Sequence, residues 1–363
     1  MDVHGNPYRS IRLSQDDRQV EIIDQTRLPH EFVVVRLSTL DQAVEAICDM
    51  QVRGAPLIGA TAAYGFCLGL LENAEDKSLR VIADTLIRCR PTAVNLRWAV
   101  QRMLTVLLPL SPSERVAAAY EEAAAICEED VAANKDIGKH GGGLLREIWE
   151  KKGKSAPVNI LTHCNAGWLA TVDWGTALAP VFRAHMDSIP VHVWVDETRP
   201  RNQGAHLTAW ELVSAGIDHH LIVDNAGGHL MQHGQVDICI VGTDRTAASG
   251  DVCNKIGTYL KALAAFDNQV PFYVALPGST IDWQVSDGAG EIPIEERAPD
   301  EVLQVQGLHE RQLIQVGIAP ANTPAANPAF DVTPARLVTG LITERGICSA
   351  SRAGLLSLYP EKG

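Results

Sequence analysis

Two side chains stand where reactive groups of an enzyme are often found, each directly after a short apolar run. Cys164 follows Val158 to His163 and precedes a turn of small residues, and Asp244 follows Asp237 to Gly242. If both runs are strands of a parallel sheet, the two side chains lie at the sheet edge where ligands bind. A thiol at a following helix N-terminus would be exposed and inclined to ionise. A carboxyl group partly withdrawn from water would stay protonated and act as a general acid.

Both residues also have an ordinary interpretation. Cys164 can be a buried structural cysteine like the other seven, and Asp244 can cap a turn, which is common after strands. The occurrence of both groups at equivalent strand ends favours the catalytic interpretation.

Several basic and amide side chains are placed to bind a phosphate or sugar. Arg53-Gly54-Ala55-Pro56 is expected to open an apolar helix, where free N-H groups and a forked guanidinium suit an anion. Arg90-Pro91-Thr92 repeats this pattern before another helix. Asn254-Lys255 is expected to begin a third helix, and Gln203-Gly204 a fourth. Together these segments predict a small phosphorylated ligand.

Other chemistries find less support in the sequence. There is no Walker loop, no Gly-x-Gly-x-x-Gly after a strand and no cysteine cluster. His229 and His233 are spaced for zinc on a predicted helix, but they have no evident third ligand, so no metal site is expected. A thiol hydrolase would need a histidine partner for Cys164, and His163 should point the other way from its strand.

The elements that must position these residues fall into two parts. In residues 1–150 we expect a small antiparallel sheet, from Val20-Glu21-Ile22-Ile23 and Phe32 to Leu37, followed by helices. The expected helices are Leu40 to Met50, Leu57 to Leu71, Ser78 to Arg88, Ala93 to Leu108, Pro112 to Asn134 and Gly138 to Lys151. The sequence thus predicts a mainly helical N-terminal domain.

In residues 151–363 short strands alternate with helices, which predicts a Rossmann-like C-terminal domain with a parallel sheet. The expected strands are Val158 to His163, His192 to Asp196, His220 to Asp224, Asp237 to Gly242 and Phe272 to Leu276. The expected helices are Trp168 to Arg183, Gln203 to Ala215, Ala226 to His233 and Asn254 to Phe266. The fold class is therefore α/β.

Composition narrows the kind of protein. The 363 residues are 46% hydrophobic and 21% charged, with a formal net charge of -13, which disfavours nucleic acid as a partner. None of the eight cysteines forms a Cys-x-x-Cys pair, so we expect reduced thiols in the cytoplasm. The N-terminus lacks the pattern of a signal peptide, and the apolar runs are short, so no membrane span is expected.

Six motifs in a fixed order resemble the methylthioribose-1-phosphate isomerase family, over about Ile23 to Gly346. They are Arg53-Gly54-Ala55-Pro56, Arg90-Pro91-Thr92-Ala93-Val94-Asn95, His163-Cys164-Asn165, Asp196-Glu197-Thr198-Arg199-Pro200 with Gln203-Gly204, Gly242-Thr243-Asp244-Arg245 and Asn254-Lys255-Ile256-Gly257-Thr258. The wider superfamily includes ribose-1,5-bisphosphate isomerase and regulatory subunits of a translation-initiation exchange factor.

The resemblance implies a homodimer without a cofactor that converts 5-methylthioribose 1-phosphate into its ketose during methionine salvage. It implies Asp244 as proton donor and Cys164 as the group that supports the transition state. It also implies a set of substrate contacts: Arg53, Gly54, Ala55, Arg90, Gln203, Asn254 and Lys255.

Two points stay open at the level of the sequence. The hydrogen can move as a hydride or as a proton through an enediol, and a depressed thiol pKa would favour the proton. The substrate can also be a relative such as 5-deoxyribose 1-phosphate or ribose 1,5-bisphosphate, and a non-catalytic regulatory subunit that binds sugar phosphates is the remaining alternative.

Overall fold

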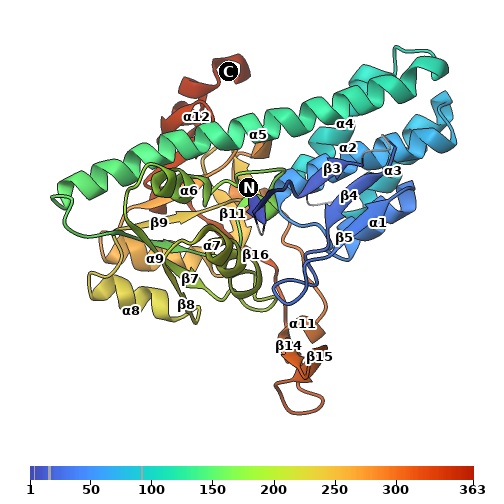
Figure 1. The fold of residues 1–363 in the computed structure, drawn as a ribbon. Coiled ribbons are helices and arrows are strands. Elements are labelled where there is room, and N and C mark those ends of the chain that lie inside the picture. The colour runs from blue at the N-terminus through green and yellow to red at the C-terminus, as the bar shows by residue number, and fades with distance from the viewer. Residues whose placement is uncertain (4, 15–17, 91–92) are drawn as a thin grey trace.

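The computed structural model describes residues 1–3, 5–14, 18–90 and 93–363. A helical region and a region built on a parallel sheet lie side by side, and the long helix α5 (Pro112–Lys151) runs along both (Figure 1). A mainly helical N-terminal region and a Rossmann-like C-terminal region were both predicted, and the α/β fold confirms them. The boundary at residue 150 stays a prediction.

The helical region is packed around one apolar helix, α2 (Ala55–Glu72), whose residues from Ala55 to Leu70 are all buried. It contacts α1 (Leu40–Cys48), α3 (Asp76–Cys89), α4 (Val94–Leu107) and α5. Among the described residues α2 is the one helix that is long and apolar enough to cross a membrane. However, 83% of this helix is buried inside the protein. An apolar helix surrounded by other helices is a core helix.

Short antiparallel strands flank this helical core. The predicted sheet is confirmed as β3 (Ile11–Leu13), β4 (Val20–Ile23) and β5 (Val34–Leu37), with β4 in the middle. A further pair at the N-terminus consists of β1 (Asp2–Val3) and β2 (Asn6–Pro7).

A seven-stranded sheet forms the core of the C-terminal region, in the order β18-β17-β12-β9-β6-β7-β8. All its pairings are parallel except that of β17 with β18. The five predicted strands are confirmed within one or two residues. The bounds are β6 (Val158–Thr162), β7 (Val191–Asp196), β8 (His219–Ile222), β9 (Ile238–Val241), β12 (Phe272–Ala275), β17 (Gly340–Thr343) and β18 (Gly346–Cys348).

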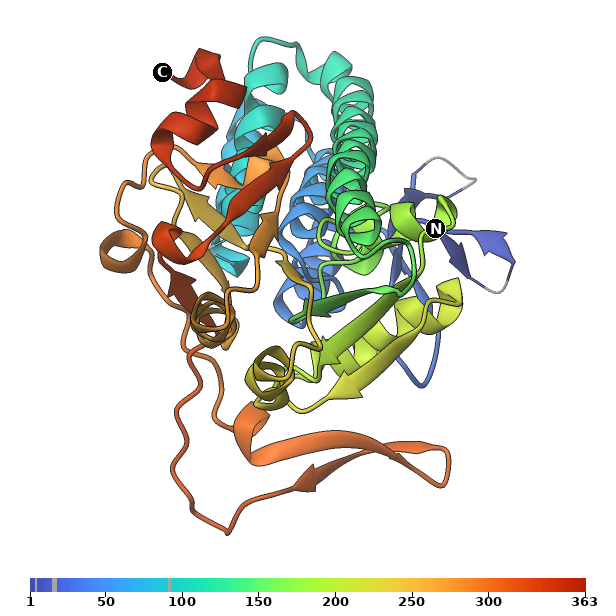
Figure 2. The ribbon, with the colours of Figure 1, turned by 90° about the vertical axis from the view of Figure 1, so that its left-hand side faces the viewer.

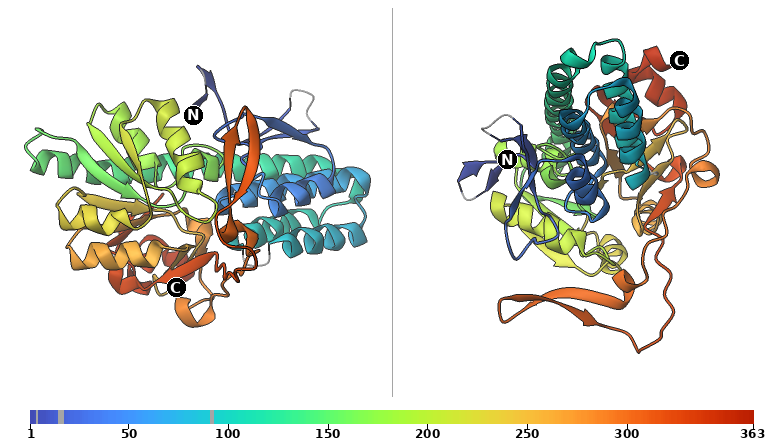
Figure 3. Two further views of the ribbon diagram at one scale, coloured as in Figure 1. Left: turned by 90° about the horizontal axis from the view of Figure 1, so that it is seen from below. Right: turned by 90° about the vertical axis from the view of Figure 1, so that its right-hand side faces the viewer.

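Helices cover both faces of this sheet, as Figure 3 shows from below. Alternate strand residues divide between two cores: Ile160 and Ile240 pack toward α5, α6 and α7, whereas Leu161 and Val241 pack toward α8, α9 and α12. This alternation is that of a sheet buried on both faces. The helix bounds are α6 (Ala179–Met186), α7 (Ala209–Ala215), α8 (Ala226–Gln232), α9 (Thr258–Asp267) and α12 (Arg352–Leu358).

A second, four-stranded sheet lies beyond the strand ends and carries part of the site. Its order is β13-β10-β11-β16, with β10 (Arg245–Ala247), β11 (Val252–Lys255), β13 (Ile281–Asp282) and β16 (Phe330–Thr333). The hairpin of β14 (Gln304–His309) and β15 (Gln312–Gly317) projects away from the body (Figure 2). The remaining short helices are η1 (Trp168–Ala170), η2 (Gly204–Thr208), η3 (Gly278–Thr280), α10 (Gly288–Glu291), α11 (Asp300–Leu303), η4 (Ala335–Leu337) and η5 (Pro360–Lys362).

Two predicted helices are placed differently in the structure. The helix predicted from Trp168 to Arg183 is wrong over its first part, because Trp174 and Gly175 have positive φ values that interrupt a helix, and α6 begins only at Ala179 with Pro180 in its first turn. The helix predicted from Asn254 begins instead at Thr258, because Asn254 belongs to β11 and pairs with β16.

The helices predicted from Pro112 to Asn134 and from Gly138 to Lys151 are one continuous helix, α5. Its glycines do not end it, because three of them lie where α6 approaches closely. A Cβ on Gly138 would lie 3.1 Å from the Ala179 carbonyl oxygen, and one on Gly141 would overlap the Pro180 ring. The small residues therefore serve helix packing and do not mark a turn.

This packing predicts opposite effects for two neighbouring glycines of α5. Gly141→Ala should destabilise the protein by about 1–3 kcal/mol through overpacking against Pro180. Gly143→Ala meets nothing within 4 Å and should instead stabilise the helix by up to about 1 kcal/mol. Chemical denaturation followed by circular dichroism measures both, and a stability of Gly141→Ala equal to that of Gly143→Ala would contradict the packing role.

Candidate active site

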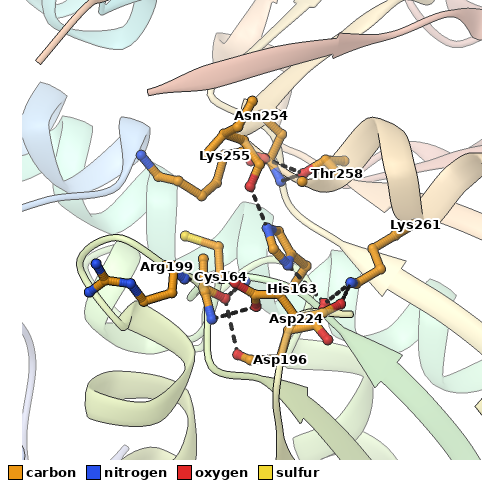
Figure 4. Close-up of polar contacts among 12 residues, drawn as sticks. His163, Cys164, Asp196, Arg199, Asp224, Asn254, Lys255, Thr258 and Lys261 are labelled. Carbon is orange, nitrogen blue, oxygen red and sulfur yellow. Dashed lines mark hydrogen bonds and ion pairs between the residues drawn. The ribbon is translucent and has the colours of Figure 1, made fainter. Parts of the chain in front are cut away.

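The carboxyl ends of β6 and β9 bring Cys164 and Asp244 to one small cavity of about 30 Å³. This volume holds about one or two water molecules, so the cavity must widen to admit a larger ligand. Its lining combines residues from both halves of the chain: Arg53, Gly54, Ala55, Pro56, His163, Cys164, Asn165, Ala166, Ala170, Thr171, Thr176, Gly242, Thr243, Asp244, Asn254 and Pro277. In Figure 4 Cys164 lies to the left of His163, and Asn254 and Lys255 lie above it.

Cys164 occupies a strained and enclosed position directly after β6. Its φ of 67° lies in the left-handed region, and its backbone N-H donates to Thr198 Oγ1 at 2.8 Å. The expectation of an exposed thiol is wrong, because the residue is only 6% exposed. Burial raises the pKa of the thiol, against the lowering effects of Arg53 and Lys255. The thiol is thus neutral at neutral pH, where a thiolate was expected.

The local geometry explains this difference. The helix expected to follow Cys164 is absent; the next helical element is the three-residue turn η1, so no helix N-terminus stabilises a thiolate. The thiol instead donates to Gln203 Oε1 at 2.9 Å.

Asp244 lies in the turn between β9 and β10. Its backbone N-H donates to the Cys253 carbonyl oxygen at 3.0 Å, and Thr243 Oγ1 donates to the same oxygen at 2.9 Å, which fixes the turn. Burial raises the pKa of the Asp244 carboxyl group, against the lowering effects of Lys255, Arg53 and Arg90. The withdrawal of this carboxyl group from water that the sequence predicted is therefore found, and it favours the protonated acid.

Arg53 precedes α2, as predicted, and its guanidinium reaches across to the loop after β6. Gly54 is the N-cap of α2 with φ of 93°, and a Cβ there would overlap Ala170. The guanidinium donates from Nη1 to Asn165 Oδ1 at 2.5 Å and from Nη2 to the Asn165 carbonyl oxygen at 2.6 Å. Its Nε is buried and finds no hydrogen-bond partner among the described residues.

Arg90 is the C-cap of α3, and its guanidinium is also mostly enclosed. Its Nη2 lies 3.2 Å from Glu295 Oε2, while Nε and Nη1 are buried without a partner in the described part of the chain. The predicted helix start that follows it is confirmed at Val94, but Pro91 and Thr92 lie outside the described residues. Glu295 is a neighbour of the site that the sequence analysis missed, since 205 positions separate it from Arg90.

Asn254 and Lys255 end strand β11 and do not begin a helix as predicted. Asn254 Nδ2 donates to Thr258 Oγ1 at 3.0 Å. Lys255 Nζ donates to the Ala329 carbonyl oxygen at 2.9 Å and lies 4.5 Å from the centre of the Phe330 ring. Burial lowers the pKa of Lys255, although Cys164 and Asp244 raise it. The ammonium is thus electrostatically coupled to both candidate catalytic groups.

Gln203 connects the site to a larger neighbouring cavity. The residue precedes the π-helical turn η2, is 5% exposed and accepts the Cys164 thiol hydrogen bond. The second cavity, of about 240 Å³, is lined by Gln203 and Arg53 together with residues of the β14–β15 hairpin. Arg53 lines both cavities, so the two form adjoining parts of one region.

A buried ionic network lies beneath Cys164 and was not predicted. His163 Nδ1 lies 2.8 Å from Asp196 Oδ2, and its Nε2 lies 2.8 Å from the Ile256 carbonyl oxygen (Figure 4). Lys261 Nζ is 3.2 Å from the same Asp196 oxygen. Both ring nitrogens of His163 are thus bonded to groups other than Cys164. This arrangement disfavours a Cys-His dyad of a thiol hydrolase.

The same network contains the one group of potential metal ligands in the described residues, namely His163, Asp196 and Asp224. The Lys261 ammonium also donates to the Asp224 carbonyl oxygen, so a positive charge already stands beside these ligands. The Asp224 carboxylate accepts the backbone N-H groups of Thr198 and Arg199 at 2.7 and 2.8 Å. We therefore assign this group a structural role.

Two known proteins with similar sequences carry the same description. The chain is 63% identical to a methylthioribose-1-phosphate isomerase of Gluconobacter oxydans, over 100% of this chain and 99% of the relative. It is 62% identical to a protein of the same description from Rhodospirillum rubrum, over 100% and 94% of the two chains.

Two solved structures with the same fold carry different descriptions. The 5-methylthioribose 1-phosphate isomerase from Pyrococcus horikoshii superposes with a TM-score of 0.82 at 38% identity, over 99% of this chain and 100% of that one. A structure described as the delta subunit of translation initiation factor eIF-2B from A. fulgidus reaches 0.79, also at 38% identity, over 98% and 100%. A family model matches residues 51–350, a span that contains all the site residues named above. The chain therefore belongs to the initiation factor 2 subunit family.

Proposed function

We propose that the protein is an aldose-ketose isomerase that converts 5-methylthioribose 1-phosphate into 5-methylthioribulose 1-phosphate in methionine salvage. Full-length relatives at 60–63% identity are described as isomerases of this substrate. The site residues support this chemistry, since they combine cationic groups, an acid whose pKa is raised by burial and an enclosed thiol.

One observation carries the proposal: buried guanidinium N-H groups converge on the site without a partner. Arg53 Nε and Arg90 Nε and Nη1 are in this state among the described residues. Buried donors of a charged group are costly to leave unpaired, so an anionic ligand is expected to complete them. A phosphate has the oxygens and the charge to do so, and the N-terminus of α2 adds free backbone N-H groups.

Asp244 is proposed as the acid that opens the sugar ring. In an aldose 1-phosphate the anomeric oxygen is esterified, so the ring opens only if its ring oxygen is protonated. A carboxyl group whose pKa is raised by burial keeps the necessary proton. After hydrogen moves from C2 to C1, the C2 hydroxyl proton returns to Asp244 and leaves the ketone. Atoms and charge balance without a cofactor.

Cys164 is proposed to support this transfer as a neutral thiol. Its raised pKa and 6% exposure disfavour a thiolate base, and therefore favour transfer of the hydrogen as a hydride within an enclosed site. The remaining substrate contacts are proposed for Gly54, Ala55, Gln203, Asn254 and Lys255, with Arg53 and Arg90 at the phosphate. We further propose a cytoplasmic homodimer that binds neither nucleic acid nor membrane.

Turnover of 5-methylthioribose 1-phosphate, with the product identified by NMR, tests the proposal. Asp244→Asn should reduce kcat by about 10²- to 10⁴-fold because the ring oxygen loses its acid, and Cys164→Ser should also reduce it strongly. Substrate binding should persist in both variants. Cys348→Ser and the exposed Asp267→Asn are matched controls outside the site and should keep wild-type rates.

The outcomes separate the alternatives. A wild-type protein that binds sugar phosphates but turns none over would be a regulatory binding subunit. Turnover restricted to 5-deoxyribose 1-phosphate or ribose 1,5-bisphosphate would keep the mechanism and replace the substrate.

The raised pKa of Asp244 also predicts how stability depends on pH. Its folded-state pKa lies above the ordinary value of 3.8, so its contribution is fully present below 3.8 and is lost as pH rises through the folded pKa. The melting temperature of Asp244→Asn should therefore increase relative to that of the wild type as pH rises above 3.8 and through the folded-state pKa of Asp244. A difference in melting temperature that stays constant with pH would contradict the burial of an acid.

A further inference from the structure

Glu211 is a buried carboxylate beneath the site that the proposed reaction does not use. It lies on α7, is 1% exposed and accepts three N-H groups. Oε1 accepts Asn165 Nδ2 at 2.9 Å and the Leu169 backbone N-H at 3.2 Å, and Oε2 accepts the Trp168 backbone N-H at 2.9 Å. Three donors converge from one loop, and only a carboxylate offers acceptors on both of its terminal atoms.

The loop after β6 is shaped around this carboxylate. A Cβ on Gly167 would overlap the Glu211 carboxylate, so the glycine allows the chain to pass directly over it. The two backbone N-H groups that follow, of Trp168 and Leu169, then point at the carboxylate. Glu211 thus holds the segment that links Cys164 to η1.

The contact with Asn165 has a directional consequence. An asparagine amide has a donor end and an acceptor end of nearly equal shape, and its orientation is decided by its partners. Here Glu211 and Thr208 Oγ1, the latter at 3.2 Å, both take the NH₂ end. Thr208 is an acceptor at this contact because its own hydroxyl donates to the Cys164 carbonyl oxygen at 2.7 Å. The amide oxygen must therefore face the other way.

On the other side, that oxygen meets Arg53. The guanidinium donates to the side-chain and main-chain oxygens of Asn165 through its two terminal nitrogens, which fixes its plane. If the amide turned over, its NH₂ group would face the guanidinium, and two donors would oppose each other. Glu211 binds the NH₂ end of the Asn165 amide and thereby turns the amide oxygen toward Arg53. The orientation of the Arg53 guanidinium therefore depends on Glu211.

We propose that Glu211 is a positioning residue for anion binding: through the Asn165 amide it orients the Arg53 guanidinium toward the substrate phosphate. The inference rests on the proposed function, which assigns the phosphate to Arg53. Burial raises the pKa of Glu211 to about 7, while Asn165, the two backbone N-H groups and Arg53 lower it. The contacts that Glu211 organises therefore favour its ionised form, against the effect of burial.

Glu211→Gln tests the proposal with little change of shape. Whichever way the glutamine amide lies, its NH₂ end faces at least one of the three N-H donors. In either orientation Asn165 also loses a charged acceptor, so the hold on Asn165 is weakened. KM for 5-methylthioribose 1-phosphate should rise by about tenfold or more, the loss expected for a hydrogen bond to a charged group, while kcat changes far less. An unchanged KM, or a loss confined to kcat, would overturn the proposal.

A double-mutant cycle with Arg53→Lys distinguishes positioning from general support of the fold. Lysine cannot reproduce the two-point contact with Asn165, so Glu211→Gln should add no further increase in KM on this background. Additive effects of the two substitutions on KM would show that Glu211 acts independently of Arg53 and would contradict the proposal. Asp130→Asn is the matched control, because burial raises the pKa of Asp130 to about 7 too. Its carboxyl group accepts the backbone N-H of Val172 and, within the described part of the chain, forms no hydrogen bond or ion pair with Arg53. It should leave KM unchanged.

Two further measurements cover other outcomes. If Glu211→Gln does not fold, Asn165→Ala interrupts the same chain of contacts and should raise KM with the same lack of additivity toward Arg53→Lys. If the wild type turns over no sugar phosphate, the proposed function fails, but calorimetric affinity for inorganic phosphate still tests Glu211. Weaker phosphate binding by Glu211→Gln would support the positioning role, and equal affinity would refute it.

Discussion

The two-point contact between Arg53 and Asn165 joins the halves of the chain at the site. Arg53 belongs to the start of the buried helix α2, and Asn165 belongs to the loop that follows the central strand β6. This contact holds the N-terminus of α2 against the loop that follows β6. Gly54 and Ala170 reinforce it, since their close approach leaves no room for a side chain between them. The remaining site residues are arranged around this junction.

Burial shifts the pKa values of three ionisable groups at the junction in directions that suit an isomerase reaction. It raises the pKa of Asp244 and of Cys164, and it lowers the pKa of Lys255. In each case the neutral form gains, because an enclosed site penalises charge of either sign. An acid and a thiol that both retain their protons can work side by side without repelling each other. The cations Arg53 and Arg90 are left to define the electrostatic character of the cavity.

Much of this arrangement could be predicted because it depends on local patterns. Apolar runs bounded by turns revealed the strands, and the residues that follow β6 and β9 were found at the cavity. The prediction failed where long-range packing overrides a local pattern. A break was predicted between Asn134 and Gly138, but α5 continues through it, and Gly138 and Gly141 allow α6 to approach. Asn254 resembled a helix start, but pairing with β16 extends the strand. The burial of Glu211 had only a weak signal in the sequence. The residue stands four positions after the apolar Leu207, and both lie on the buried face of the helical segment.

The unbroken course of α5 has a mechanical consequence. Its 40 residues extend for about 60 Å, and its side chains enter the cores of both regions: Ala123 and Ile126 on one side, Ile137 and Leu145 on the other. A continuous helix packed into both cores resists the rigid-body rotation of one region against the other by which many two-domain enzymes close. A ligand must therefore be admitted by smaller displacements of covering segments, such as the one that carries Glu295 against Arg90.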